Sequence, residues 1–451
     1  MKPDTFCFES FLPFPPSVVF SWHLKEGALD RMIPPWQKVV VTQKGSPAEV
    51  GSQTHLSMHK GPVSTQWVAR HVAFEKERYF TDEQIRGPFR FFKHTHSVEY
   101  EQEGSVWCDT IEFIPPWFIS SNYVHKELQK IFHFRHRRLL EDISRIQTYA
   151  LPSQKILLSG SSGMVGRALY AFLTNAGHEV YTLRRQPSCK EKKIVGWDPT
   201  QDHNHQRDFE GFDAIIHLAG ENIGKKRWNA AQKDKIFKSR CRDTWLLSQI
   251  ILRLQTPPKV FICASAVGIY GDRGDEVLTE SSSFGNDFLA SVCVEWEKSS
   301  QCLEDKGIRV CHTRFGYILD PSGGMLQQIL PLFRLGLGGI MGSGQQIMPW
   351  VALDEVIYGI YHCLAKAEIS GAVNLVSPSP VSQKEFALSL AKHLHKACFF
   401  PTPAWALRFA LGERADALIL RSARVQPDKL IASGYSFFAK DLSEYFKAFI
   451  A

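Results

Sequence analysis

The feature that most constrains this sequence is a short apolar run, Lys155 to Ser159, followed at once by a glycine-rich turn and a helical pattern. The turn reads Gly160-Ser161-Ser162-Gly163-Met164-Val165-Gly166. We expect the helix over Met164 to Asn175, with Gly177 ending it. Glycines permit a tight turn and close approach of the backbone to a pyrophosphate, and a helix N-terminus attracts phosphate. In this strand–turn–helix order the spacing predicts a dinucleotide-binding site, and a purely structural glycine turn is the alternative.

The residues after the next expected strand, Glu179 to Leu183, indicate which dinucleotide would bind. An NAD site places an acid about 20 residues beyond the turn, where it holds the ribose 2′-hydroxyl. This chain has Arg184 and Arg185 there instead, and two guanidinium groups suit a 2′-phosphate. The sequence therefore predicts NADP(H) as the cofactor, with two unliganded surface arginines as the alternative.

Further short apolar runs follow, in alternation with helical stretches. The runs are Ala214 to Leu218, Val260 to Ala264 and Val310 to Arg314. One helical stretch, Phe288 to Asp305, has Asn286 or Asp287 placed to cap it. Because apolar strands that alternate with helices are typical of a buried parallel sheet, the sequence predicts a Rossmann-type, doubly wound α/β fold.

The first 150 residues show a different pattern, rich in aromatic residues, histidine and proline. Strands are expected at Gln66 to Phe74, Phe89 to Tyr100 and Ser105 to Phe113, and a helix from Val124 to Arg145. The segment Gln147 to Gln154 is the expected linker. The pattern indicates an α+β domain ahead of the Rossmann-type one.

Composition and charge exclude several classes of protein. The net charge is only +7 over 451 residues, and acidic residues directly follow the basic cluster at 135–138, so we expect no nucleic-acid partner. No apolar stretch reaches the roughly 18 residues of a membrane span. The ten cysteines form no C-x-x-C motif and no secretory signal is present, which favours a cytoplasmic location.

Two histidines, His94 and His96, fall on one face of an expected strand and are candidate metal ligands. No third ligand is near them in sequence, so we predict packing or pocket lining for this pair and no metal site. The aromatic residues of this part either line an apolar cavity, whose ligand would itself be apolar, or form an ordinary core. They are Trp22, Trp36, Trp67, Phe74, Phe91, Phe92 and Trp107.

Several longer strings carry a resemblance to a known family. They are His217-Leu218-Ala219-Gly220-Glu221-Asn222-Ile223, Lys226-Arg227-Trp228, Ser265-Ala266-Val267-Gly268-Ile269-Tyr270-Gly271, Arg314-Phe315-Gly316, residues 331–339, Asn374-Leu375-Val376-Ser377-Pro378 and Arg424-Val425-Gln426-Pro427-Asp428-Lys429-Leu430. Together they resemble the epimerase family proteins, an atypical branch of the extended short-chain dehydrogenases/reductases in the NAD(P)-dependent epimerase/dehydratase superfamily. Some members bear the label of cell-division inhibitor.

The resemblance implies a division into domains. Residues 154–400 would form an extended NAD(P)-binding Rossmann domain with substrate-binding segments, and residues 401–449 the family's C-terminal domain of unknown function. Residues 1–150 resemble a START-like, helix-grip ligand-binding domain of the polyketide cyclase type. The matching strings there are Pro34-Pro35-Trp36, Gly87-Pro88-Phe89 and His94-Thr95-His96. Since relatives in the superfamily are often dimers, a homodimer is expected.

The resemblance also implies a cofactor role for single residues. These are Gly160, Ser161, Ser162, Gly163, Met164, Val165 and Gly166 at the pyrophosphate, Arg184 and Arg185 at the 2′-phosphate, Leu218, Ala219 and Gly220 under the adenosine side, and Ser265 at the nicotinamide.

One departure from the family pattern concerns catalysis. Reductases of this superfamily use a Tyr-x-x-x-Lys pair as proton donor and ribose clamp. No tyrosine here has lysine four residues later, and Phe288 and Val292 stand where the pair is expected. Ser265 and Tyr270 are therefore the candidate catalytic residues, with buried packing as the alternative for Tyr270. The candidate substrate residues are Asn222, Trp228 and Arg240, with core packing as the alternative for Trp228.

Two functions remain open from the sequence. The first is an NADPH-dependent oxidoreductase or epimerase-like enzyme that acts on a small apolar carbonyl or alcohol compound. The second is a catalytically degenerate, NADPH-bound sensor or scaffold, linked to cell division. The missing Tyr-x-x-x-Lys pair favours the second, whereas the glycine turn and the two arginines suit both.

Overall fold

The computed structural model describes residues 2–61, 63–201 and 206–450 of the chain. It divides into two compact units, and each is described by itself. The first contains the described residues up to Ala150 together with Ala171–Gly177, and the second contains Leu151–Tyr170 and the described residues of His178–Ile450. Within the described residues, no helix has the length and apolar character needed to cross a membrane.

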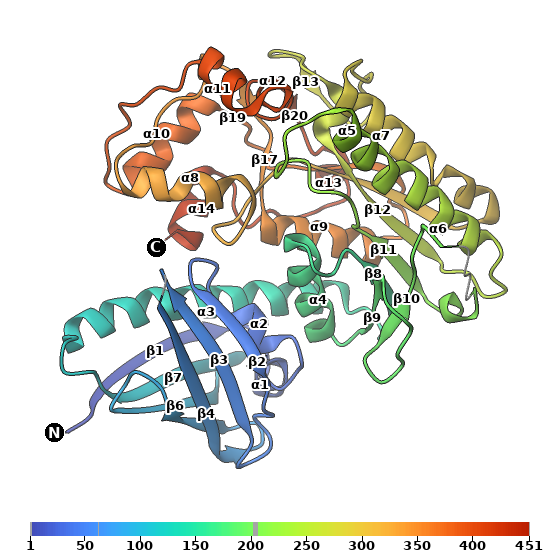
Figure 1. Cartoon of the computed structure of the whole chain (residues 1–451). Helices are drawn as coiled ribbons and strands as arrows, with labels where there is room; N and C mark the ends of the chain where they lie inside the picture. The colour runs from blue at the N-terminus through green and yellow to red at the C-terminus, as the bar shows by residue number, and fades with distance from the viewer. Residues whose placement is uncertain (1, 62, 202–205, 451) are drawn as a thin grey trace. The chain divides into compact units, whose positions relative to one another are not determined.

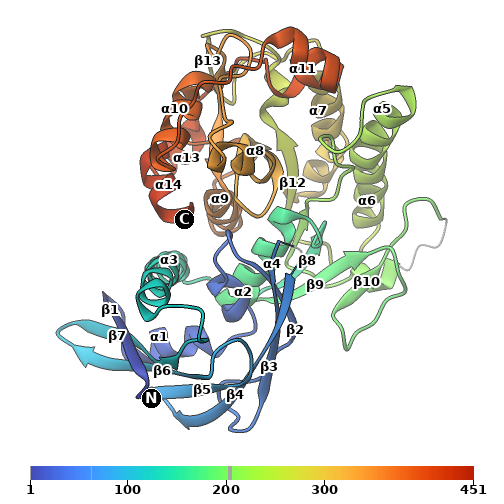
Figure 2. The same cartoon turned by 60° about the vertical axis from the view of Figure 1, so that its left-hand side comes forward.

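The N-terminal unit is a seven-stranded antiparallel sheet with the order β1-β7-β6-β5-β4-β3-β2. Its strands are β1 (Asp4–Leu12), β2 (Lys38–Gln43), β3 (Gln53–Lys60), β4 (Val63–Glu75), β5 (Tyr79–Arg86), β6 (Phe91–Glu101) and β7 (Gly104–Ile114). Its helices are α1 (Pro16–His23), α2 (Ala28–Met32) and α3 (Ser121–Tyr149). Figures 1 and 2 show α3 along one face of the sheet, which confirms the predicted α+β class.

The long helix and the strands share one buried face. In β7 nearly every second side chain is buried, as expected for a strand with one face on a core. Helix α3 buries Val124, Leu128 and Phe132 in the same apolar cluster as residues of β6 and β7. The Ser120 hydroxyl caps the helix by accepting a hydrogen bond from the backbone N–H of Tyr123 at 3.3 Å. The helix extends beyond its expected bounds at both ends.

Most of the aromatic residues of this unit belong to its core. Trp22 and Trp107 lie in one buried apolar cluster, and Phe74 packs against it. Phe92 lies in a second cluster, against which Trp67 packs. The core alternative therefore accounts for five of the seven aromatic residues considered above.

The second unit is a seven-stranded parallel sheet with the order β10-β9-β8-β11-β12-β14-β18. Its strands are β8 (Lys155–Ser159), β9 (Glu179–Arg184), β10 (Ile194–Gly196), β11 (Ala214–His217), β12 (Val260–Ala266), β14 (Arg309–Phe315) and β18 (Gly371–Leu375). Its larger helices are α4 (Met164–Ala176), α5 (Ala230–Phe237), α6 (Asp243–Leu252), α7 (Phe288–Lys298), α8 (Gly324–Arg334), α9 (Leu353–Ala365) and α10 (Gln383–His393). The order confirms the predicted Rossmann-type fold, with its direction reversing between β8 and β11.

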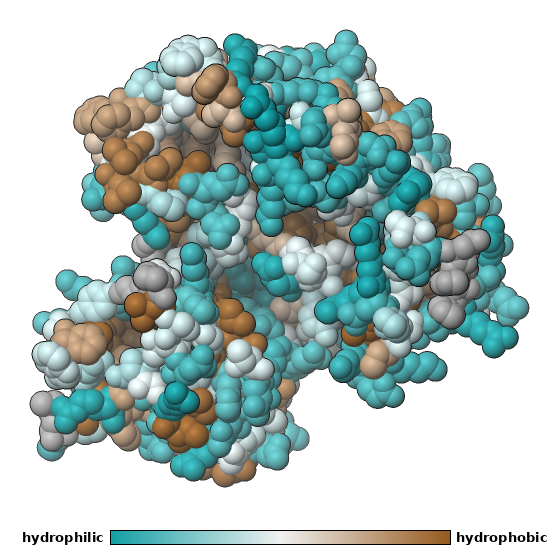
Figure 3. Space-filling view, in the orientation of Figure 1, coloured by the Kyte–Doolittle hydropathy of each residue, from teal (hydrophilic) through white to brown (hydrophobic). Residues whose placement is uncertain are grey.

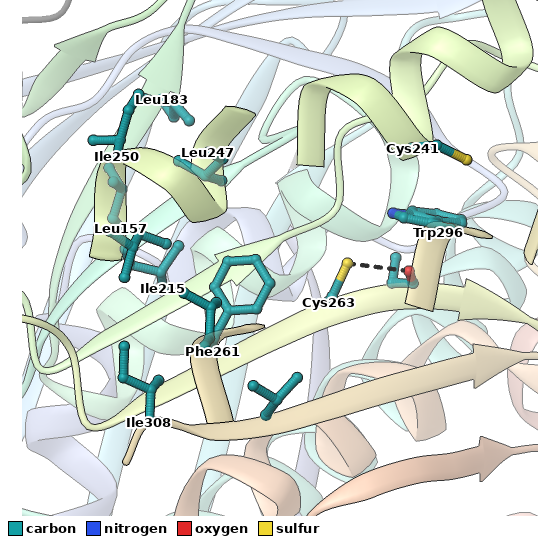
Figure 4. Packing of buried hydrophobic residues seen from close by; sticks show 14 of the residues in the cluster. Leu157, Leu183, Ile215, Cys241, Leu247, Ile250, Phe261, Cys263, Trp296 and Ile308 are labelled. Atoms are coloured by element: carbon teal, nitrogen blue, oxygen red, sulfur yellow. Dashed lines mark hydrogen bonds between the residues drawn. The ribbon is translucent and has the colours of Figure 1, made fainter. Parts of the chain in front are cut away.

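The core of this unit explains why its strands appear in the sequence as continuous apolar runs. Leu157, Ile215 and Phe261, from three neighbouring strands, are fully buried. Leu247 of α6 and Trp296 of α7 belong to the same cluster, part of which Figure 4 shows. Strands buried on both faces have no solvent side to fill with polar residues.

One expected helix is wrong in its extent. Instead of a single helix over Phe288 to Asp305, α7 ends at Lys298 and a 3-10 helix spans Gln301–Lys306. The hydroxyl of Ser299 donates to the Glu295 carbonyl oxygen at 2.6 Å, a local bond that competes with continuation of a helix. At the other end Asp287 is the cap, as one of the two predictions had it, and accepts a hydrogen bond from the Ala290 N–H at 2.9 Å.

The C-terminal segment folds back onto the parallel sheet unit. Its elements are α11 (Ala404–Leu411), α12 (Glu413–Leu418), β20 (Arg424–Val425), α13 (Asp428–Ala432) and α14 (Leu442–Phe449). Strand β20 pairs in parallel with β13 (Val277–Leu278), which follows β12 in the chain. Arg421 donates to the Gly268 carbonyl oxygen at 3.1 Å. These contacts link the C-terminal segment to the loop after β12, close to the predicted catalytic residues.

Exposed apolar side chains gather on this unit over α8, α10 and α11, where Figure 3 shows brown surface. They include Leu332, Leu335, Leu337, Phe399, Phe400, Trp405 and Phe409. Apolar surface of this kind is typical of an interaction site. The homodimer expected above stays a prediction.

Candidate functional site

The glycine turn lies at the carboxyl end of β8, where α4 begins. Gly160 has a φ of +71°, in the left-handed region that favours glycine, and a Cβ there would lie 2.7 Å from the Leu218 carbonyl carbon. A Cβ on Gly166 would overlap the Gly160 carbonyl oxygen. The backbone therefore approaches the strand ends more closely than any side chain would permit. A cradle of this shape, with the N-terminus of α4 behind it, fits a pyrophosphate.

The turn after β11 lies beside the glycine turn. The backbone N–H groups of Leu218 and Ala219 donate to the Ser159 hydroxyl oxygen at 3.1 and 3.3 Å. The same hydroxyl is 2.8 Å from Nδ1 of His217. These bonds hold residues 218–220 next to the glycine turn, at the point where the strand order reverses. Open α/β sheets bind their ligands at this position.

Arg184 ends β9 and Arg185 follows it, and both are exposed. Nε of Arg184 donates to the Thr182 hydroxyl at 3.1 Å. The Arg185 guanidinium is 3.8 Å from the Asp243 carboxylate, and its side chain is 68% exposed. Asp243 accepts a shorter hydrogen bond, 2.8 Å, from Arg242. Both charges of the Arg184–Arg185 pair are therefore accessible to an anion from solvent.

The three candidate substrate residues follow β11 in the chain but differ in their surroundings. Asn222 is exposed, and its side-chain oxygen accepts hydrogen bonds from the N–H groups of Gly224 and Lys225 at 2.9 and 3.1 Å. Trp228 is buried in the core and donates to the Ile223 carbonyl oxygen at 2.9 Å. Arg240 is half-buried and donates to the Glu221 carbonyl oxygen at 3.0 Å.

The two candidate catalytic residues belong to one buried polar network. The Ser265 hydroxyl donates to Oε1 of Glu297 at 2.7 Å. Arg314 forms a bidentate ion pair with Glu297, with both N–O distances 2.8 Å. Arg314 also donates to the Tyr270 hydroxyl at 2.8 Å, and that hydroxyl donates to Oδ1 of Asn374 at 2.7 Å. Both candidate hydroxyls are thus bonded to protein groups in the interior.

The protonation of this network follows from its burial and its charges. Burial raises the pKa of Tyr270, although Arg314 beside it opposes the shift. Burial also works against ionisation of Glu297, but the hydrogen bonds and charge of Arg314 outweigh it and hold the pKa of Glu297 below its ordinary value. At neutral pH the network is an ion pair with a neutral phenol attached. A phenol of raised pKa is a weaker proton donor.

Glu297, Arg314 and Asn374 were not among the site residues predicted from the sequence. Arg314, Asn374 and Tyr270 each lie in one of the sequence strings that carry the family resemblance. In the structure, Arg314 and Asn374 both hydrogen-bond the Tyr270 hydroxyl. Asn374 also donates to the Gln426 carbonyl oxygen at 2.9 Å. Glu297 lies in an amphipathic helix, where a single acid is ordinary, and no local signal distinguishes it.

The order of the parallel sheet, the glycine turn at its point of reversal and the adjacent turn after β11 define a Rossmann-type protein of the dinucleotide-binding class. Comparison with known proteins gives the family. The NAD dependent epimerase/dehydratase family matches residues 156–375, and a domain of unknown function, DUF1731, matches residues 402–449.

Sequence relatives cover the same part of the chain. The epimerase family protein Mb2239 of Mycobacterium bovis is 36% identical over 290 residues, which are 64% of this chain and 95% of that protein. The human epimerase family protein SDR39U1 is 30% identical over 300 residues, 66% of this chain and all of that protein. The chain therefore belongs to the NAD-dependent epimerase/dehydratase family.

Two solved structures extend the comparison. A nucleoside-diphosphate sugar epimerase from Corynebacterium glutamicum is 30% identical with a TM-score of 0.82, and the match covers 98% of this chain and 90% of that one. Human SDR39U1 (isoform 2), solved with NADPH, is 29% identical with a TM-score of 0.61, over 65% of this chain and 98% of that one. The first of these matches includes the N-terminal unit.

Proposed function

We propose that this protein binds NADPH at its glycine turn and acts as an atypical extended short-chain dehydrogenase/reductase on a small apolar carbonyl or alcohol compound. The observation that carries the proposal is the exposed Arg184–Arg185 pair at the end of β9, the strand next to β8. Bound NADPH supplies a hydride to a carbonyl carbon. The human relative solved with NADPH supports this choice of cofactor.

In this proposal each group of residues predicted from the sequence binds a different part of the cofactor or the substrate. The turn from Gly160 to Gly166, with Ser161, Ser162, Met164 and Val165, holds the pyrophosphate. Residues 218–220 pass under the adenosine side. Of the three substrate residues, Asn222 and Arg240 retain polar atoms near the end of β11, whereas Trp228 supports the loop from within the core.

Titration calorimetry of the full chain with NADPH and, separately, NADH tests the proposal. We expect NADPH to bind at least tenfold more tightly, a gap of about 1.4 kcal/mol. If neither nucleotide binds, the proposal fails at its first step, and the chain is not a dinucleotide-dependent protein.

The double variant Arg184→Ala/Arg185→Ala should lose the preference for NADPH. Hydrogen bonds to a charged group contribute about 1.5 to 3 kcal/mol, and at an exposed site we expect the lower end, so NADPH affinity should fall about tenfold or more. NADH affinity should stay within about twofold, because NADH carries no 2′-phosphate. Calorimetry of both nucleotides measures the difference.

The matched control is Lys392→Ala/Lys396→Ala, which removes two exposed positive charges from the α10 end of the same unit. It should leave both affinities unchanged. An equal loss of NADPH affinity in the two double variants would mean that net charge, and not the site at the end of β9, sets the preference.

A specific observation favours a second candidate function, in which NADPH is held without turnover and the protein is a sensor or scaffold. Ser265 and Tyr270 are bonded to Glu297, Arg314 and Asn374 inside the protein. Phe288 and Val292 provide no proton donor on α7. Under this candidate, the network stabilises the fold around the cofactor.

Tyr270→Phe separates the two candidates. If Tyr270 is the proton donor, the wild-type protein oxidises NADPH with members of a panel of aliphatic and aromatic aldehydes, and the variant loses that activity. If the network is structural, neither protein oxidises NADPH above the protein-free rate. The variant then keeps its NADPH affinity and loses about 1 to 3 kcal/mol of unfolding free energy, because Asn374 and Arg314 lose a buried partner. Activity retained in the variant would remove Tyr270 from catalysis.

We propose that the N-terminal unit is a START-like helix-grip domain. Its element order, a strand and two helices followed by six strands and a long helix, supports this proposal. Its ligand would be apolar or aromatic. A cytoplasmic location, a division of the remainder into residues 154–400 and 401–449, and a homodimer complete the proposal.

A further inference from the structure

The interior face of the N-terminal sheet holds a group of ionisable side chains from three neighbouring strands. Strand pairing sets Asp82 of β5 directly opposite His94 of β6, and places His96 of β6 opposite Asp109 of β7. Residues paired across strands point to the same face of a sheet. His94 and His96, two residues apart, also share that face. The four side chains therefore converge, although only the two histidines are neighbours in the sequence.

Asp109 lies against both imidazole rings and hydrogen-bonds His94. Its Oδ1 lies 2.7 Å from Nε2 of His94 and 2.6 Å from Nδ1 of His96. Its Oδ2 accepts hydrogen bonds from Nε1 of Trp107 at 2.8 Å and is 2.7 Å from Nε2 of His136. Asp109 is thus a buried acceptor that favours a proton on Nε2 of His94, whereas Nδ1 of His96 is close to Oδ1 but not aligned for a hydrogen bond.

The remaining nitrogen of each histidine faces Asp82. Nδ1 of His94 is 3.9 Å and Nε2 of His96 is 3.7 Å from Oδ2 of Asp82. When Asp109 accepts the Nε2–H of neutral His94, Nδ1 of that ring presents its lone pair, and a neutral His96 with its proton on Nδ1, near Asp109, presents the lone pair of Nε2. Two lone pairs and a carboxylate oxygen then face one another across a gap too wide for a hydrogen bond. This arrangement suits a cation between them.

We propose that Asp82, His94 and His96 bind a divalent transition-metal ion such as Zn²⁺, with Asp109 as the hydrogen-bond partner that orients His94. Two imidazole nitrogens and one carboxylate oxygen are a ligand set that zinc uses in three-ligand sites. Tetrahedral bonds of about 2.0 to 2.1 Å place donors about 3.4 Å apart, so the donors would close by about half an ångström. A carboxylate that accepts the distal N–H is the usual support of a metal-bound histidine.

A second observation points to a ligand at the same place. His71 of β4 is only 7% exposed and stands directly opposite Asp82 in the strand pairing. Neither of its ring nitrogens has a hydrogen-bond partner among the described residues. A buried imidazole with no partner is costly, and this one lies on the face where Asp82 is. His71 is therefore positioned beside Asp82, just outside the group formed by Asp82, His94 and His96.

The charges and the accessibility of the site agree with metal binding. Asp82 and Asp109 are two carboxylates in the interior. Burial works against a charge on His96, but Asp109 and Asp82 raise its pKa to about 9, so a bound dication would displace a proton from this ring. The side chains of Asp82 and His96 are 16% and 15% exposed, whereas those of His94 and Asp109 are only 7% and 4% exposed. An ion can therefore reach the site from the side of Asp82 and His96.

The test uses the full chain, stripped with a chelator and titrated with ZnCl₂ by calorimetry. We expect one saturable equivalent bound at the site, and the Co²⁺-substituted protein should show visible absorption typical of nitrogen and oxygen ligands. Asp82→Asn and His96→Gln should each weaken Zn²⁺ binding by at least about 100-fold, and Asp109→Asn by about 10- to 100-fold. NADPH affinity, measured on the same samples, should not change. The test of the zinc site is therefore independent of the test of the proposed function.

The matched control is His125→Gln, which removes the half-exposed partner of Asp4 at 3.2 Å and should leave Zn²⁺ affinity unchanged. Cys7→Ser serves as a second control, because Cys7 and Cys108, 3.3 Å apart, form with Glu9 the other group of metal-ligating residues among those described. If a site variant fails to fold, X-ray absorption spectroscopy of the zinc-loaded wild type identifies the atoms that bind the zinc. Absence of binding, binding that survives Asp82→Asn and His96→Gln, or sulfur in the first shell would overturn the proposal.

Discussion

Gly166→Ala should abolish tight NADPH binding while leaving the fold of both units intact. A Cβ at this position would overlap the Gly160 carbonyl oxygen, so the turn and the first turn of α4 must move apart. The backbone N–H groups that we propose bind the pyrophosphate would then lose their alignment. Since each hydrogen bond to a charged group contributes about 1.5 to 3 kcal/mol, the loss of two predicts at least a 100-fold weaker affinity, about 2.7 kcal/mol.

Calorimetry with NADPH measures this loss, and circular dichroism confirms that the variant is folded. Gly224→Ala is the matched control, because a Cβ on Gly224 meets its nearest neighbour, Oδ1 of Asn222, at an ordinary 3.6 Å. It should bind NADPH as the wild type does. A folded Gly166→Ala protein with wild-type affinity would show that the cofactor is not bound at this turn.

Glu297→Gln should strongly destabilise the parallel sheet unit. The Glu297–Arg314 pair is bidentate, and the two side chains are only 12% and 3% exposed. Removing one partner of a buried ion pair costs about 3 to 5 kcal/mol, because the other charge is left uncompensated. Scanning calorimetry should show a fall in the Tm of this unit by about 5 to 15 °C. Ser265 loses its charged acceptor at the same time.

The matched control lies on the same helix. Glu295 pairs with Lys298 at 2.9 Å, but these side chains are 49% and 60% exposed, so Glu295→Gln should cost less than about 1 kcal/mol. The pH dependence adds a second test. Because the folded-state pKa of Glu297 lies below its ordinary 4.5, its stabilisation is complete above about pH 4.5 and is lost as the pH falls through the folded-state value. The difference in unfolding free energy between the wild type and Glu297→Gln should therefore decrease in acid. A difference that does not change with pH would contradict the ion-pair explanation.

The parts of the fold that could be predicted are those whose sequence signals lie in residues close together in the chain. The strand from Lys155 to Ser159, the glycine turn and α4 follow one another without a break, and each has its own local signal. The same holds for the alternation of apolar strands and helices, which indicates a parallel sheet because a strand buried on both faces has no polar side. Residues 301–306 differ from the predicted continuous helix because the side-chain hydrogen bond of Ser299 favours an early end of α7. The hydrophobic periodicity of the sequence gives no sign of such a bond.

Sequence by itself determined the class of the parallel sheet unit, the position of the glycine turn and the two arginines on which the proposal of NADPH rests. Only the tertiary structure decided the surroundings of Ser265 and Tyr270, since Glu297, Arg314 and Asn374 come from three separate elements. It alone placed Asp82 and His71 beside the histidine pair that the sequence left without a third ligand. The physical reason is the same in both places: strand pairing and helix packing bring together side chains whose distance along the chain carries no signal of their contact in space.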